Sequence, residues 1–225
     1  MSGLIHRQLS GIRVSAMRVG VLLATEGEAM RFDVFFDYTC PFVYRAAEVI
    51  DKVRRSGERV LDVRWRYFSL AQVNSKDDGW TVWDAPPSEP VGGRLAFQAA
   101  EAARRQGLFE EMHWRLLRAR HRDHLDLDGA VVDDLAVAAG LDMDRFKADV
   151  ADPSILEVLA SDHTTAVLEH GVFGTPTFVF AGGEAAYVRL APGALEDGAA
   201  DVLEHVLAIA EGEPRILEIK RPYKR

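Results

Sequence analysis

Two β-rich stretches enclose a helical pattern near the start of the chain, and this order limits the fold more than any other feature of the sequence. Residues 31–36 (Arg-Phe-Asp-Val-Phe-Phe) have the composition of a strand, and apolar and polar residues alternate over 60–68. Between them, Pro41 stands where a helix would begin and Gly57 where it would end. The pattern predicts a βαβ unit with parallel strands and a right-handed crossover.

The remaining chain divides into a helical block and a second β-containing segment. Apolar residues recur at helical spacing through most of 94–171. Strand-like runs follow at 177–180 and 186–190, on either side of Gly182-Gly183, and an amphipathic helix is predicted over 195–212. The order βαβ, helices, ββα predicts an α/β protein in which an all-helical subdomain is inserted into a β-containing domain.

The predicted organisation has four parts. We expect a poorly structured N-terminal extension at 1–30 and a basic C-terminal tail at 213–225, with the α/β domain formed by 31–93 and 172–212 around the helical insertion at 94–171. Within the first half of that domain, 69–93 has little periodicity and three prolines, which is typical of a long functional loop.

Composition excludes several classes of protein. The net charge is −8, so binding to a nucleic-acid backbone has no bulk electrostatic support. No apolar run approaches the ~18 residues that span a bilayer, so we expect no membrane partner. The single cysteine, Cys40, excludes an internal disulfide and a multi-thiolate metal site.

The N-terminal residues contain a weak resemblance to an export signal. Three arginines precede an apolar stretch at 19–24, but six residues are fewer than the ~7–15 of a secretory core. We therefore expect a cytoplasmic protein; the sequence leaves self-association into an oligomer open.

Two short segments contain the residues that point to chemistry. Cys40 follows the first predicted strand and precedes Pro41 at the predicted helix start, where the positive end of the helix dipole favours a thiolate. The second segment, Gly-Thr-Pro-Thr at 174–177, enters the third predicted strand. The bond between Thr175 and Pro176 is a candidate for a cis peptide, because only proline makes the cis form inexpensive. A nucleophilic thiol and an inert buried cysteine both remain open at this point.

These motifs, in this order, resemble the DsbA-like family of the thioredoxin-like fold from about Phe32 to Glu211. Cys-Pro-Phe-Val stands where that family has its Cys-x-x-Cys site, and Thr175-Pro176 stands where it has a cis-proline facing the sulfur. The stretch from Phe68 to Trp83 is similar to a cytoplasmic, FrnE-like subgroup. The resemblance implies a thiol-disulfide oxidoreductase with no tightly bound cofactor.

Val43 occupies the position of the family's second cysteine, and the chain has no other thiol. A mixed disulfide at Cys40 would therefore be resolved by an external thiol, because the intramolecular step needs a second sulfur. We expect monothiol exchange with a protein disulfide or with a small-molecule thiol as co-substrate. The candidate catalytic residue is Cys40, and the candidate substrate-binding residues are Tyr38, Thr39, Pro41, Phe42, Thr175, Pro176, Trp80 and Trp83.

Other interpretations stay open beside this one. Asp37 either tunes the thiol or caps the turn, and His121 with His124 has helical spacing but is weak as a metal site, so we expect none. The element order also resembles kappa-class glutathione transferases and 2-hydroxychromene-2-carboxylate isomerases, which hold a glutathione sulfur with a hydroxyl at this helix start; Thr39 is the neighbouring hydroxyl. The third alternative is a non-catalytic binding module that uses the helical block and the loop containing Trp80 and Trp83.

Overall fold

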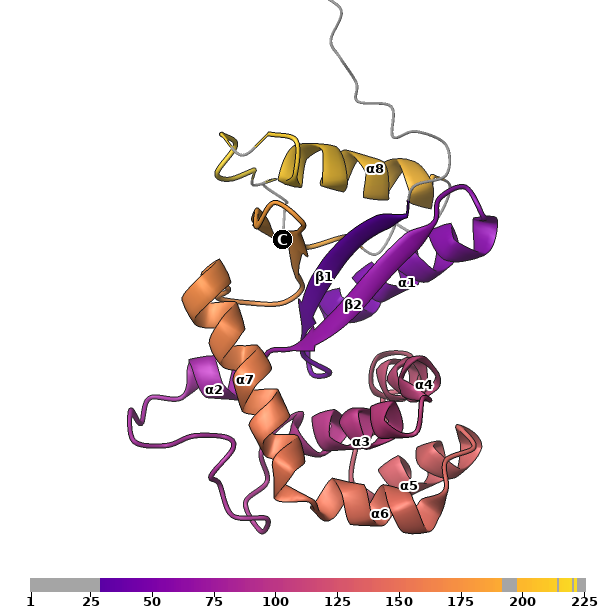
Figure 1. The fold of residues 1–225 in the computed structure, drawn as a ribbon, viewed down its shortest axis with the longest axis vertical. Helices are drawn as coiled ribbons and strands as arrows, with labels where there is room; N and C mark the ends of the chain where they lie inside the picture. Colours follow the sequence, from indigo (N-terminus) through magenta and orange to yellow (C-terminus); the bar gives the residue numbers. More distant parts are fainter. Residues whose placement is uncertain (1–28, 192–197, 214, 220, 222–225) are drawn as a thin grey trace, which may run out of the picture.

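The computed structural model describes residues 29–191, 198–213, 215–219 and 221 (Figure 1). Its centre is a four-stranded sheet with the strand order β2-β1-β3-β4. β1 (Met30–Phe36) pairs in parallel with β2 (Leu61–Tyr67) and antiparallel with β3 (Thr177–Phe180), which pairs antiparallel with β4 (Ala185–Tyr187). The predicted βαβ unit and hairpin are thus present, and the predicted fold class is confirmed.

Helix α1 (Pro41–Ser56) connects the two parallel strands and begins and ends where the sequence predicts. Pro41 occupies the first turn, where a missing N–H has no cost, and Gly57 ends the helix in the left-handed conformation with φ +71°. The buried face of α1, which includes Val43 and Ile50, packs towards the sheet, and α8 (Ala199–Ala210) contacts α1.

The helical insertion lies beyond the end of β1 from which α1 begins (Figure 1). Three of its helices start at aspartates whose side chains accept backbone N–H bonds, Asp128, Asp142 and Asp152. The last helix contacts β2 and returns the chain to the sheet. The insertion comprises α3 (Arg94–Arg105), α4 (Phe109–His121), α5 (Gly129–Ala138), α6 (Met143–Ala151) and α7 (Pro153–His170).

Two local predictions were incomplete. The predicted loop at 69–93 contains a short helix, α2 (Leu70–Asn74), capped by the Ser69 side chain. The strand predicted at 186–190 ends at Tyr187, because Tyr187 pairs with Thr177, the first residue of β3. Beyond it, Val188 N–H donates to the Pro176 carbonyl, but proline has no N–H to donate in return.

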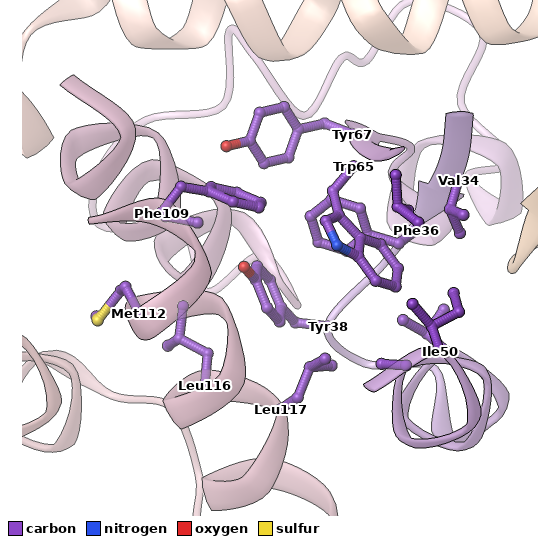
Figure 2. Packing of buried hydrophobic residues seen from close by; sticks show 14 of the residues in the cluster. Val34, Phe36, Tyr38, Ile50, Trp65, Tyr67, Phe109, Met112, Leu116 and Leu117 are labelled. Carbon is purple, nitrogen blue, oxygen red and sulfur yellow. The ribbon is translucent and has the colours of Figure 1, made fainter. Parts of the chain in front are cut away.

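One hydrophobic core joins the sheet to the insertion. Phe36 and Trp65 from the sheet and Tyr38 from the turn lie against Leu116 and Leu117 of α4 (Figure 2). Phe36 contacts Trp65 edge-on, with ring centroids 5.7 Å apart. The insertion is therefore packed as part of the same core as the sheet.

The predicted extension at 1–30 lies outside the described residues except for its last two, and the predicted basic tail is described only in part. In the described parts of the chain, no helix has the length and apolar character needed to cross a membrane.

Candidate functional site

Cys40 is the N-cap residue of α1. The turn after β1 closes with a hydrogen bond from Cys40 N–H to the Asp37 carbonyl (3.1 Å), and Val43 N–H then donates to the Cys40 carbonyl (3.1 Å). The side chain of Cys40 makes no capping hydrogen bond, so its sulfur is not engaged by the helix that follows. The thiol therefore sits at the positive end of α1, as the sequence predicts.

The segment before β3 faces this thiol. The Cys40 thiol donates to the Thr175 carbonyl oxygen, with Sγ and O 3.2 Å apart, and the Thr175–Pro176 bond is cis as predicted. Cys40 is 6% exposed, so the sulfur is nearly covered. The structure thus brings together Cys40, Thr175 and Pro176, although Cys40 and Thr175 are 135 residues apart in sequence.

Asp37 holds the turn that carries Cys40. One carboxylate oxygen accepts both the N–H and the hydroxyl of Thr39, each at 2.7 Å, and the other accepts Leu70 N–H at 2.7 Å. Burial raises the pKa of Asp37, and these hydrogen bonds oppose that effect. Asp37 therefore caps the turn and also fixes the start of α2 against it.

The Tyr38 side chain lies in the core between the sheet and α4 (Figure 2). Its hydroxyl is 2.9 Å from Nδ1 of His113, another fully buried side chain, and burial raises the Tyr38 pKa well above its usual value. The Tyr38 side chain, which was predicted to bind substrate, is therefore not exposed at the surface. Its backbone carbonyl instead accepts a hydrogen bond from His121 at 2.8 Å.

The other predicted residues of the helix start lie at the surface. Thr39 and Pro41 are exposed. Phe42 is half-buried beneath two guanidinium groups, that of Arg189 at 3.9 Å from the ring centroid and that of Arg45 at 5.2 Å. These contacts order the face of α1 next to Cys40.

The two tryptophans of the predicted loop are anchored by contacts with residues other than Cys40. The Trp80 indole N–H donates to Glu89 (3.0 Å), and the Gln72 side chain bonds both the Trp80 carbonyl and Val82 N–H. The Trp83 ring lies 5.8 Å from that of His163 on α7. The loop is thus held by its own helix α2 and by α7, and no described contact joins either tryptophan to Cys40.

A cleft of about 600 Å³ opens beside the helix start. One wall is a face of α1, with Tyr44, Arg45 and Glu48 one turn or more beyond Pro41; the other is the end of α4. Thr39 and Pro41, the neighbours of Cys40, both line it. This cleft has no signal in the sequence, because its two walls come from segments that lie far apart in the chain.

His121 connects the two walls. It ends α4, donates from Nε2 to the Tyr38 carbonyl, and stacks on Tyr44 with ring centroids 5.7 Å apart and planes at 20°. His124 lines the same cleft, but the described residues contain no group of three or more side chains suited to hold a metal ion. The only sequence signal for His121 and His124 was their helical spacing, which relates to a metal site and not to a contact with the turn before Cys40.

The fold and the placed thiol define a thioredoxin-like protein in which a cysteine at a helix start faces a cis-proline. The chain belongs to the family of DSBA-like thioredoxin domains, whose model matches residues 31–196. The predicted family is therefore confirmed, and the chain is a member of a family of thiol-disulfide oxidoreductases.

Solved structures share this fold at low sequence identity. A probable DsbA oxidoreductase from Streptomyces coelicolor has a TM-score of 0.59 and 22% identity, over 87% of this chain and 93% of that one. The cytosolic disulfide reductase DsbM from Pseudomonas aeruginosa, solved with GSH, has a TM-score of 0.53 and 19% identity, over 79% and 99%.

Part of the chain also resembles much longer proteins. It is 36% identical over 115 residues to the Na(+)/H(+) antiporter NhaA 1 of Mycolicibacterium vanbaalenii. The match covers 51% of this chain but only 15% of the antiporter, so the shared region is a small part of that protein.

Proposed function

We propose that this protein catalyses thiol-disulfide exchange through Cys40 alone. The observation that carries the proposal is the pairing of a thiol at the start of α1 with the carbonyl before a cis-proline, while Val43, fully buried, occupies the second position. The sequence has one cysteine, so a second sulfur must come from another molecule.

The proposed cycle has two balanced exchanges. The Cys40 thiolate attacks a substrate disulfide, forming a mixed disulfide and releasing the other half of the substrate as a thiolate. An external thiolate then attacks the substrate sulfur of that mixed disulfide, forming a new disulfide and releasing the Cys40 thiolate. A low-molecular-weight thiol is the proposed co-substrate and a protein or small-molecule disulfide the proposed substrate. The relative solved with GSH supports a small thiol, and its description as cytosolic supports a reducing cytoplasmic setting.

The first experiment asks whether Cys40 forms the mixed disulfide. Native protein is incubated with oxidised glutathione and its intact mass is measured, with Cys40→Ser as the matched control. We expect one glutathione adduct on the wild type, at Cys40, that fresh reductant removes, and none on the variant. An unmodified native wild type would refute the proposal, as would an adduct that fresh reductant leaves in place.

The transferase alternative requires a hydroxyl free to hold a glutathione sulfur. The Thr39 hydroxyl donates to Asp37 at 2.7 Å instead, which favours the cysteine-based reaction. Conjugation of glutathione to an electrophile by Cys40→Ser, at the wild-type rate, would reverse this preference. A pure binding module would in turn retain all of its function in Cys40→Ala.

A further inference from the structure

The proposed monothiol cycle depends on an external thiol that must attack as a thiolate. A thiol with an ordinary pKa of about 8.5 is only about 3% ionised at pH 7. A proton acceptor placed where that thiol docks would therefore accelerate the second exchange, and the thiol's ionised fraction limits the gain at pH 7 to about 30-fold. The need for such an acceptor rests on the proposed function, and the question is which side chain takes this proton.

A cleft lies beside the start of α1, lined by the two neighbours of Cys40 but not by its nearly covered sulfur. Its volume of about 600 Å³ is in the range of small-molecule sites, and Thr39 and Pro41 on its rim flank Cys40. Arg45 and Arg120 line it beside the carboxylate of Glu48, and Arg120 is already paired with Asp126 at 2.7 Å.

The hydrogen bond of His121 fixes which of its nitrogens carries the proton. Nε2 lies 2.8 Å from the Tyr38 carbonyl oxygen, and a carbonyl can only accept, so Nε2 carries the hydrogen. In the neutral imidazole, Nδ1 then has a lone pair and accepts. Stacking on Tyr44 restrains the plane of the ring, so the acceptor has a fixed orientation beside the helix start.

The surroundings keep this imidazole uncharged at neutral pH. Burial lowers the pKa of His121, and the nearby Arg120, His124 and Arg45 lower it further, against the opposing effect of the Tyr38 carbonyl. A neutral His121 can take up a proton, whereas a charged one could not. Because its lowered pKa makes it a weak base, it takes the proton only as the new sulfur–sulfur bond forms. The charged and titratable groups that line the cleft around it are Tyr44, Arg45 and Glu48 from α1 and Arg120 and His124 from the end of α4 and beyond.

We propose that Nδ1 of His121 accepts the proton of a small-molecule thiol in this cleft as that thiol attacks the mixed disulfide at Cys40. The S–H proton passes to Nδ1, the new sulfur–sulfur bond forms to the substrate sulfur, and the bond to Cys40 breaks with its electron pair on the Cys40 sulfur. The imidazolium then returns its proton to that thiolate or to water, which restores the starting state.

His121→Gln is the informative variant, because the glutamine amide can still donate to the Tyr38 carbonyl but cannot accept a proton. The wild type, this variant and the control His205→Gln are converted to their glutathione mixed disulfides. His205 is an exposed histidine on α8. Reduced glutathione is added between pH 6.5 and pH 9, samples are quenched with acid, and loss of the adduct is followed by mass.

We expect His121→Gln to lose its adduct up to about 30-fold more slowly than the wild type at pH 7, and within about 2-fold of it at pH 9, where the attacking thiol is already mostly ionised. His205→Gln should match the wild type throughout. Equal rates in His121→Gln and the wild type at pH 7 would overturn the inference, and a deficit that is the same at every pH would overturn it too, because it would indicate a purely structural role. In both cases normal adduct formation would leave the proposed function standing, whereas a wild type that forms no adduct refutes both.

Discussion

Val43 lies one helical turn after Cys40, with its N–H bonded to the Cys40 carbonyl and its side chain fully buried. Residues three apart on a helix share a face, so a thiol at position 43 would lie next to the Cys40 sulfur. In Val43→Cys we expect the introduced thiol to attack the Cys40 sulfur of a glutathione mixed disulfide, release glutathione and leave an internal disulfide to Cys40. Intact mass, followed in the absence of any added thiol, should show the adduct disappearing.

Val43→Ser is the matched control, since serine has nearly the shape of cysteine and no thiol. Its adduct should persist until external thiol is added, as in the wild type. A persistent adduct in Val43→Cys would contradict the placement of position 43 beside the sulfur, and rapid loss in Val43→Ser would indicate hydrolysis or another route.

Asp37 is a second residue at which the hydrogen bonds of the two carboxylate oxygens can be tested separately. In Asp37→Asn, the amide oxygen can replace the oxygen that Thr39 uses, but the amide nitrogen then faces Leu70 N–H, donor against donor. We expect a loss of about 1–3 kcal/mol in the free energy of unfolding, measured with urea. Asp134→Asn, at an exposed position on α5, should be near neutral. A neutral Asp37→Asn would show that the Leu70 contact contributes nothing.

At the scale of single elements, Gly57 at the end of α1 allows the cost of a left-handed backbone conformation to be measured alone. Gly57 has φ +71°, and a Cβ placed there would meet nothing within 4 Å. Gly57→Ala should therefore cost about 1 kcal/mol in the free energy of unfolding, entirely from the left-handed backbone. Gly57→Asn should cost less, because asparagine tolerates this conformation. Urea denaturation of both variants checks the prediction, and equal losses in the two would contradict it.

Elements with local signals were predictable from the sequence. Pro41 and Gly57 frame α1, because proline and glycine act through their own backbone geometry. The helix α2 was not predicted, since distant partners fix it: Asp37 accepts from Leu70, and Gln72 bonds the loop that follows. Strand β4 was overestimated for a similar reason, because β3 sets its length.

The features of the candidate site likewise divide into those that the sequence could predict and those that it could not. Cys40, Thr175 and Pro176 could be placed together from the order of elements and the resemblance to a family. The burial of Tyr38 and the contact of His121 with its carbonyl could not, because they depend on how α4 packs against the sheet. Hydrophobic periodicity shows which face of a helix is buried, but not which distant turn that face meets.

At the scale of the whole molecule, one buried histidine links the sheet to the insertion. His113, on α4, contacts Trp65 of β2 with ring centroids 4.5 Å apart, stacks on Phe109, and pairs with the Tyr38 hydroxyl. Burial lowers its pKa to about 3, and the cations Arg104 and Arg54 add to this. The folded protein therefore holds His113 neutral over the whole physiological range.

This depressed pKa predicts an acid-dependent loss of global stability. Below pH 6.5 the unfolded chain protonates its histidine at position 113, while the folded protein does not until about pH 3. The contribution of neutral His113 to the free energy of unfolding is therefore complete above pH 6.5. It falls as the pH drops, at a rate approaching about 1.4 kcal/mol per pH unit down to about pH 3.

In His113→Asn, the amide oxygen can still accept from Tyr38, but the side chain has no titratable group. We expect its free energy of unfolding, measured with urea from pH 7.5 to 4.5, to be lower at pH 7.5 and to fall less steeply. His205→Asn, at an exposed position, should keep the wild-type slope, and equal slopes in His113→Asn and the wild type would contradict a neutral, buried His113.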